Sequence, residues 1–129
     1  MTNIKMLEQV LPTAPLKIAA LKSCETLGKK VNDHIVGFRK ESLKKYVDSA
    51  LFASYKCENY LIEHSCPRFG SGEAKGVLGE SVRGKDLFVM VDVCNYSLTY
   101  TVNGHLNHMS PDDHYQDLKR IISAANGKA

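Results

Sequence analysis

The sequence predicts an α/β fold in which a mostly parallel sheet is flanked by helices. Two apolar segments carry this prediction. Residues 16–21 form a compact apolar run that leads directly into a helical pattern, which is half of a βαβ unit. Residues 87–91 are apolar at consecutive positions, as in a parallel-sheet strand with both faces covered. The elements alternate as strand, helix, strand and helix, so a layered α/β design follows.

The chain is expected to divide near residue 15. Residues 1–15 are expected to be an N-terminal extension, and residues 16–129 an α/β domain. Within the extension, residues 2–11 have the composition of a short helix, which would end before Pro12 and Pro15.

A helix is expected directly after the first strand. Ser23 offers a hydroxyl that can cap its first turn. Its apolar stripe would consist of Leu27, Val31, Ile35 and Phe38. Residues 39–49 keep the helical spacing, so they predict a continued or second helix with a solvated basic face. Residues 55–62 predict a strand.

Two glycine-containing turns, residues 68–73 and 79–86, flank a short strand-like piece. They gather an aromatic residue, a carboxylate, a hydroxyl and an arginine at loop tips. Loop tips are where binding groups concentrate. These turns are therefore the main candidates for a binding site.

Polar residues follow the strand at residues 87–91. Asp92 and Asn95 come at its carboxyl end, where open α/β sheets bind ligands, although a turn-forming role for Asn95 fits equally well. Residues 97–102 alternate in strand fashion, and Asn103 with Gly104 is a tight-turn signal. A small hairpin is expected here.

The last predicted element is a helix. Ser110 supplies a cap, Pro111 suits the first helical position, and Asn126 with Gly127 is expected to end the helix. Its buried stripe would consist of Tyr115, Leu118, Ile121, Ile122 and Ala125. Such a helix should lead to another strand, so the sheet is expected to be truncated by at least one strand.

The composition excludes several classes of function. The net charge of +3 is spread along the chain, so no nucleic-acid partner is expected. No apolar run is long enough to span a bilayer, so no membrane association is expected. The four cysteines form no CxxC pair and the first residues do not resemble a secretory signal. Reduced thiols and a cytoplasmic location are therefore expected.

The two glycine-containing turns resemble one enzyme family. Residues 69–73 read F-G-S-G-E, and residues 78–86 read L-G-E-S-V-R-G-K-D. The N-terminal domain of ribose-phosphate pyrophosphokinase (PRPP synthetase) has F-x-[DN]-x-E followed by I-G-E-S-V-R-G-x-D and an apolar strand. The second motif is the specific one, because nine consecutive positions agree in type. Residues 39–66 and 96–109 look like insertions relative to commoner members of that family.

The resemblance implies a role for each matched residue. Phe69 would stack on the adenine of ATP, and Glu73 would accept a hydrogen bond from its exocyclic amino group. Ser71 stands where the family has aspartate or asparagine, so its shorter side chain would make a different contact. Ser81 and Arg83 would hold an effector phosphate, for which the planar arginine fork is well suited. The resemblance implies no catalytic or metal-binding residue within this chain.

Purely structural roles remain open for the same residues. Phe69 could be an ordinary core residue, and Gly72 or Gly79 could serve only as turn residues. Arg83 could form a surface ion pair with Glu80 or Asp86, a contact that contributes little.

The family's reaction transfers the β,γ-diphosphoryl group of ATP to ribose 5-phosphate with Mg²⁺. The resemblance therefore implies ATP and ribose 5-phosphate as substrates of the parent enzyme, Mg²⁺ as its cofactor, and a homo-oligomer. The family's catalytic loops are absent from these residues, so the chain alone is expected to be inactive and to lack a C-terminal catalytic domain. The alternative is a non-catalytic regulatory or assembly subunit related to that family.

A group of histidines and aspartates and one cysteine raise the questions of a metal site and of a nucleophile. The cluster comprises His105, His108, His114, Asp112 and Asp113. Its H-x2-H-x5-H spacing is not a common zinc pattern, so no metal site is expected. Cys94 is expected to be a buried, inert thiol rather than a nucleophile.

Overall fold

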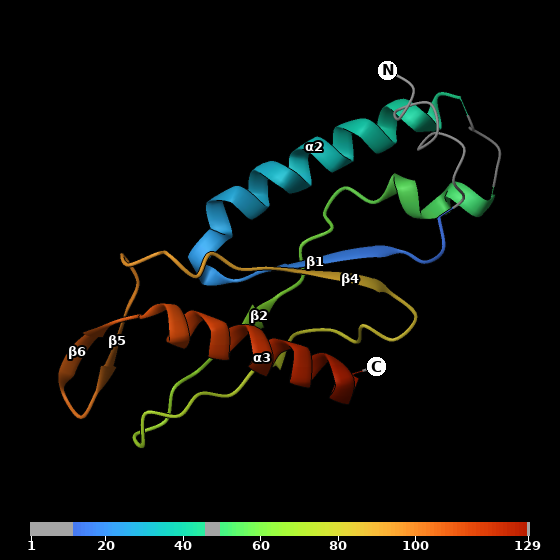
Figure 1. Cartoon of the computed structure of the whole chain (residues 1–129). Helices are drawn as coiled ribbons and strands as arrows, with labels where there is room; N and C mark the ends of the chain where they lie inside the picture. The colour runs from blue at the N-terminus through green and yellow to red at the C-terminus, as the bar shows by residue number, and fades with distance from the viewer. Residues whose placement is uncertain (1–11, 46–49, 129) are drawn as a thin grey trace.

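The computed structural model describes residues 12–45 and 50–128, so the helix expected at residues 2–11 lies outside the described part. A parallel pair of strands, β1 (Leu16–Ala20) and β4 (Asp86–Met90), lies at the centre (Figure 1). Ile18 pairs with Phe88 in the middle of this register. The expected α/β class with a parallel sheet and flanking helices is confirmed.

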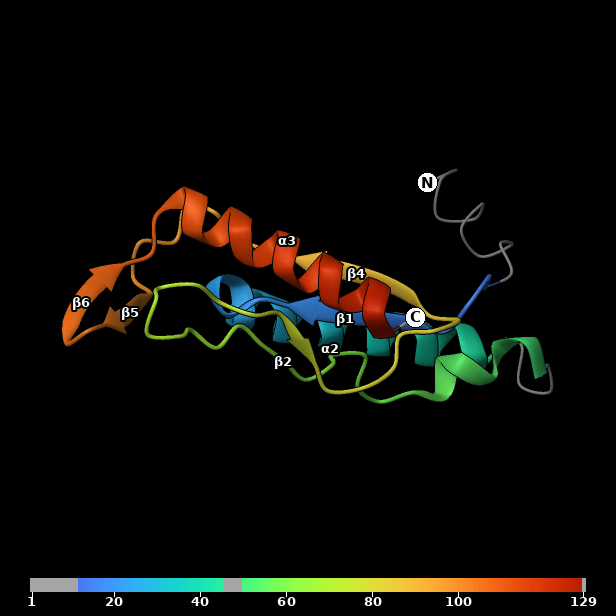
Figure 2. The ribbon, with the colours of Figure 1, turned by 90° about the horizontal axis from the view of Figure 1, so that it is seen from below.

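The two long helices lie on opposite faces of the strand pair. Figure 2 shows α3 (Pro111–Lys128) on one side and α2 (Glu25–Leu43) on the other. Two core clusters fill the layers between them, because successive side chains of a strand point to opposite faces. Ala19 belongs to the cluster beneath α3, whereas Ile18 belongs to the cluster beneath α2.

The buried face of α2 differs from the expected stripe. Leu27 and Phe38 are exposed, and the buried positions are Gly28 and Asn32. Asn32 Oδ1 accepts a hydrogen bond from the backbone N–H of Tyr60 at 2.8 Å. Val31 and Ile35 pack against the cluster beneath α2, as expected. The apolar pattern is thus right for Val31 and Ile35 and wrong for Leu27 and Phe38, because a glycine and an amide are the buried residues of this helix.

The start of α2 also differs from the expectation. A short 3₁₀ turn (Lys22–Cys24) precedes the helix, and Cys24 occupies the cap position without a side-chain bond. Ser23 does not cap the helix, because its hydroxyl accepts a hydrogen bond from the backbone N–H of Asp92 at 2.9 Å. The hydroxyl thus joins the carboxyl ends of β1 and β4.

The segment between α2 and the first hairpin is less regular than expected. The helix ends at Leu43, and Tyr46 and Val47 lie outside the described residues. A 3₁₀ helix (Ala50–Lys56) follows. The strand expected at residues 55–62 is wrong for most of its length, since only Leu61 bridges to β1, in parallel with Ile18.

Two antiparallel hairpins complete the fold. The first pairs β2 (His64–Ser65) with β3 (Val77–Leu78), and the second pairs β5 (Thr99–Val102) with β6 (His105–His108). Asn103 and Gly104 form the second turn with positive φ angles of 50° and 80°, so the expected tight turn is confirmed.

The N-terminal cap of α3 is the one predicted from the sequence. The C-terminal end of the helix and its buried face differ from the prediction. Ser110 Oγ accepts from the backbone N–H of Asp113 at 3.1 Å, and the Asp113 carboxylate accepts from the Ser110 N–H at 2.9 Å. The helix continues through Asn126 and Gly127 to Lys128. The stripe is shifted: Ile121 and His114 are buried, whereas Tyr115 and Ile122 are exposed. No helix in the described ranges is both long and apolar enough to cross a membrane.

Candidate functional site

Residues 69–73 form the tip of the β2–β3 hairpin. The backbone N–H of Phe69 donates to the carbonyl of Glu73 at 2.7 Å, and the N–H of Gly72 donates to the carbonyl of Phe69 at 2.9 Å. Gly72 has φ of +90°, a conformation that side chains other than glycine rarely adopt. These five residues, called the 69–73 turn below, are therefore a closed turn with a defined shape.

The 69–73 turn presents its side chains to solvent. Phe69 is 53% exposed, and Ser71 and Glu73 are also exposed. Ser71 Oγ accepts a long hydrogen bond of 3.5 Å from the backbone N–H of Glu73. Phe69 is thus not a core residue, and the structure brings an aromatic ring, a hydroxyl and a carboxylate together on one exposed turn.

The second candidate turn connects β3 to β4. Ser81 Oγ accepts from the backbone N–H of Arg83 at 3.3 Å, and Gly84 has φ of +67°. Val82 between them is buried and anchors the turn to the core beneath α3. Glu80 pairs with Lys17 at 3.4 Å, so it is engaged away from Arg83. The Ser81 and Arg83 side chains are exposed.

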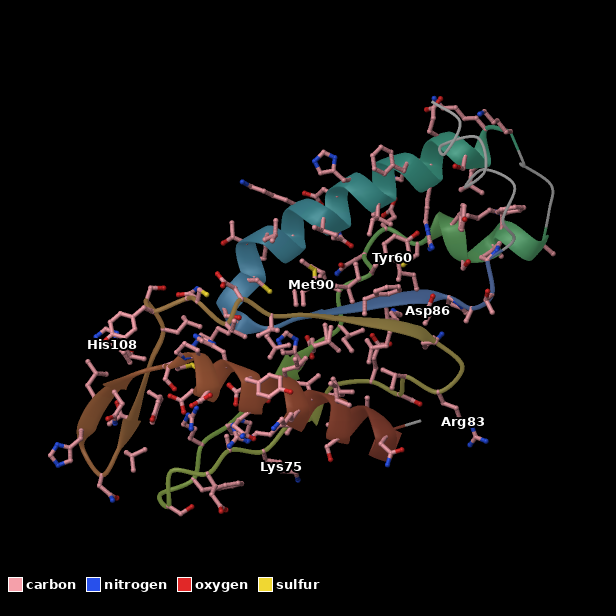
Figure 3. All side chains as sticks on the ribbon, viewed as in Figure 1. Tyr60, Lys75, Arg83, Asp86, Met90 and His108 are labelled. Atoms are coloured by element: carbon pink, nitrogen blue, oxygen red, sulfur yellow. The ribbon has the colours of Figure 1, made fainter. Side chains whose placement is uncertain are left out.

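The two turns lie at different ends of the molecule. Figure 3 shows Arg83 near Asp86, at the amino end of β4, and His108 of the second hairpin at the opposite end. Arg68, which bonds to the Gly72 carbonyl of the 69–73 turn, stacks on Tyr100 of that second hairpin. The structure therefore does not combine Phe69 and Arg83 into one site.

Arg68 holds the 69–73 turn through contacts that the sequence did not indicate. Its Nη1 donates to the carbonyl of Gly72 at 3.0 Å, and its guanidinium carbon lies 3.8 Å from the centroid of the Tyr100 ring. Its Nη2 lies 4.0 Å from Asp113 Oδ1 and has no hydrogen-bond partner among the described residues. Tyr100 and Asp113 are 32 and 45 positions further along the chain, so no local pattern indicated these contacts.

The residues after β4 have structural roles. Asn95 Nδ2 donates to the Ser23 carbonyl at 2.8 Å, and Asn95 Oδ1 accepts from the Ser97 N–H at 2.9 Å. Asp92 Oδ1 accepts from the Cys94 N–H at 2.9 Å. These bonds close a turn, so Asn95 has the turn-forming role that was the alternative to ligand binding.

The four thiols are free, and they differ in environment. The expectation that Cys94 is buried is wrong, because it is exposed. Burial raises the pKa of the Cys24 thiol, and the Asp92 carboxylate adds to the effect. Burial, with a further contribution from the Asp117 carboxylate, raises the pKa of the Cys66 thiol to about 11. Neither of these two thiols has the thiolate character that a nucleophile requires.

The three histidines do not converge. His114 is buried with Nε2 2.6 Å from the Asn95 carbonyl, and His108 stacks on Tyr96 with ring centroids 4.4 Å apart. His105 lies on β6 and is exposed. Within residues 12–45 and 50–128, no three His, Cys, Asp or Glu side chains are grouped so as to hold a metal ion.

A cleft of about 950 Å³ opens at the carboxyl end of β1. It lies between the start of α2, the stem of the β2–β3 hairpin and β5, and Arg68 and Tyr100 are on its wall. The candidate residues Phe69, Ser71, Glu73, Ser81 and Arg83 are not part of its lining. Arg68 thus lines this cleft and also bonds to the 69–73 turn.

Comparison with known proteins identifies the family. The model of the N-terminal domain of ribose phosphate pyrophosphokinase matches residues 16–129. No curated protein and no solved structure gives a match. The matched residues include the whole strand pair, both hairpins and both candidate turns. The chain belongs to the family of the N-terminal domain of ribose phosphate pyrophosphokinase.

Proposed function

We propose that this chain supplies the adenine-recognition part of a ribose-phosphate pyrophosphokinase. The parent reaction moves the β,γ-diphosphoryl group of ATP to the 1-hydroxyl of ribose 5-phosphate, giving phosphoribosyl pyrophosphate and AMP. The observation that carries the proposal is the 69–73 turn, called the adenine loop from here on, where Phe69 and Glu73 are exposed at a closed hairpin tip within a domain of this family.

The chemistry of the adenine loop suits a purine base. The Phe69 ring offers a flat apolar face for stacking, and Glu73 offers carboxylate oxygens that accept from an exocyclic amino group. Ser71 offers a hydroxyl beside them. No side chain of the loop is cationic, so the loop suits binding of the base rather than of the phosphates.

The turn that carries Ser81 and Arg83 suits a phosphate group. Gly84 gives the turn a tight shape, and the exposed guanidinium of Arg83 can donate two parallel hydrogen bonds. We assign this turn to an effector phosphate. Because it lies far from the adenine loop, a ligand there would act at a distance rather than on the base.

Magnesium belongs to the parent reaction, and we expect its ligands to come from parts of the parent enzyme other than the described residues. They contain no group of three or more acidic, histidine or cysteine side chains that could hold a metal ion. The chain by itself is therefore expected to bind nucleotide without catalysing the transfer.

We further propose that the chain self-associates. In the described residues β4 pairs only with β1, so its second edge has unpaired backbone groups, and Phe88 on this strand is 56% exposed. Exposed edges of this kind tend to pair with another chain. Sedimentation velocity over a range of concentrations tests this, and a monomer at all concentrations would contradict it.

Isothermal titration with ADP and ATP, with and without Mg²⁺, tests the proposed function. The wild-type chain is expected to bind both nucleotides weakly and without dependence on Mg²⁺. Removing a stacking ring weakens base binding by about 1–3 kcal/mol, so Phe69→Ala is expected to weaken it at least fivefold.

Phe38→Ala is the matched control, because Phe38 is 70% exposed on α2 and belongs to no candidate site. It is expected to bind as the wild type does. Absence of binding by the wild-type chain, or equal binding by the wild type and Phe69→Ala, would contradict the proposal.

A further inference from the structure

Arg68 connects the adenine loop to two other elements. It lies immediately before the loop in sequence, and it bonds across the turn to the Gly72 carbonyl. Its guanidinium stacks on Tyr100 of β5 and approaches the carboxylate of Asp113 at the start of α3. One side chain therefore links the hairpin tip, the second hairpin and a helix.

The environment of Arg68 strengthens its hydrogen bond to the Gly72 carbonyl. The Arg68 side chain is only 13% exposed, so its interactions are poorly screened by water. The hydrogen bond to Gly72 is charge-assisted, and such bonds are stronger than those between neutral groups. Asp113 is itself fixed by its reciprocal bonds with Ser110, so it offers the guanidinium a rigid partner.

The adenine loop needs such support. It lies at the end of a hairpin whose strands, β2 and β3, are each two residues long. Beyond the strands, the stem is held by the isolated bridge between Arg68 and Ala74 and by the bond from the Lys75 N–H to the Pro67 carbonyl. An unsupported tip would sample many conformations, and ordering it on binding would weaken affinity.

We propose that Arg68 is a positioning residue that pre-orders the adenine loop, with the Tyr100 ring as its support. This inference rests on the proposed function, and it adds that the β5–β6 hairpin takes part in nucleotide recognition without touching the base. Arg68 fixes the Gly72 carbonyl. Because the Gly72 N–H donates to the Phe69 carbonyl, Arg68 also fixes the backbone of Phe69, which carries the stacking ring.

Amide hydrogen exchange of the unliganded full chain tests the ordering directly. In Arg68→Ala, the amides of Phe69 and Gly72 are expected to exchange about tenfold faster, the factor that corresponds to loss of a bond to a charged group. Tyr100→Ala is expected to have a smaller effect in the same direction. Tyr100→Phe retains the ring and is expected to behave as the wild type.

Arg39→Ala is the matched control. Arg39 also stacks on tyrosines, with its guanidinium carbon 4.3 Å from the ring centroid of Tyr55 and 4.9 Å from that of Tyr60. It lies near the C-terminal end of α2, away from the adenine loop, and its replacement is expected to leave exchange at Phe69 and Gly72 unchanged. Wild-type exchange at both amides in Arg68→Ala would overturn the proposal.

Nucleotide titration of the same variants separates this inference from the proposed function. If Phe69→Ala loses ADP binding, Arg68→Ala is expected to weaken the affinity for ADP about tenfold. Arg68→Lys is expected to recover part of this affinity, because a lysine can still donate to the Gly72 carbonyl. Full affinity in Arg68→Ala would overturn the inference while leaving the proposed function intact. No ADP binding by the wild type would refute the proposed function, and the exchange data would still decide whether Arg68 orders the loop.

Discussion

Gly28 lies where α2 packs closely against Ala20 of β1. A Cβ at this position would overlap the Cβ of Ala20, and both of these atoms belong to packed elements. Neither can move without shifting the helix or the strand. A glycine here therefore sets the distance between the two elements.

Gly28→Ala is expected to lower the free energy of unfolding by about 1–3 kcal/mol, because overpacking forces the backbone apart. A Cβ added at Gly37, on the same helix, would meet no atom within 4 Å, so Gly37→Ala is expected to raise the free energy of unfolding by about 0.5–1 kcal/mol. Urea denaturation of both variants measures the two changes. Equal effects of the same sign would contradict the close approach.

The Cys66 thiol is expected to make the free energy of unfolding depend on pH. Burial raises the pKa of its thiol from 9.0 to about 11, so between these values the folded state keeps a proton that the unfolded state has lost. The contribution to stability is complete below pH 9 and falls as the pH rises toward 11. Denaturation of the wild type and Cys66→Ala over this range measures it.

The difference in unfolding free energy between the wild type and Cys66→Ala is expected to shrink as the pH rises from 9 to about 11. Cys94→Ala serves as control, because Cys94 is exposed and its removal is expected to leave the wild-type slope. A constant difference between wild type and Cys66→Ala would show that the thiol does not titrate as described.

Among the elements, α3 depends most clearly on its first turn. Ser110 and Asp113 satisfy each other's backbone N–H groups. Ser110→Ala is expected to lower the free energy of unfolding by about 1 kcal/mol, because one helical donor loses its acceptor. Ser123→Ala, at an exposed position in the same helix, is the control, and thermal denaturation compares them. Equal stability of the two variants would contradict the capping role.

The helices show where sequence patterns succeed and fail. The signals for the start of α3 and for the Asn103–Gly104 turn are local, and the structure contains both. The faces of α2 and α3 were harder to predict, because buried polar residues replace apolar ones in the packing. Asn32 holds the Tyr60 N–H and His114 meets the Asn95 carbonyl, and both partners are distant in sequence.

The site shows the same division. Phe69, Ser71 and Glu73 are separated by one residue each, so their presence on one turn followed from the sequence. Arg68 could not be recognised in the same way, because its partners Tyr100 and Asp113 reach it only through the packing of α3 and the second hairpin.

At the scale of the whole molecule, the two turns proposed to bind ligands lie at different ends of the central strand pair. The adenine loop belongs to the hairpin that reaches the β5–β6 end, whereas the turn with Arg83 lies at the amino end of β4. Neither turn shares a side chain with the other. A nucleotide base and an effector phosphate are therefore expected to bind without competing.

The most direct test is an NMR titration of the isotope-labelled chain with ADP, recorded in the absence and presence of inorganic phosphate. ADP is expected to shift the amide signals of residues 69–73 most strongly, and phosphate is expected to shift those of residues 81–84 without displacing ADP. ADP-induced shifts confined to the cleft at the carboxyl end of β1, or to residues 81–84, would contradict the assignment of the adenine loop.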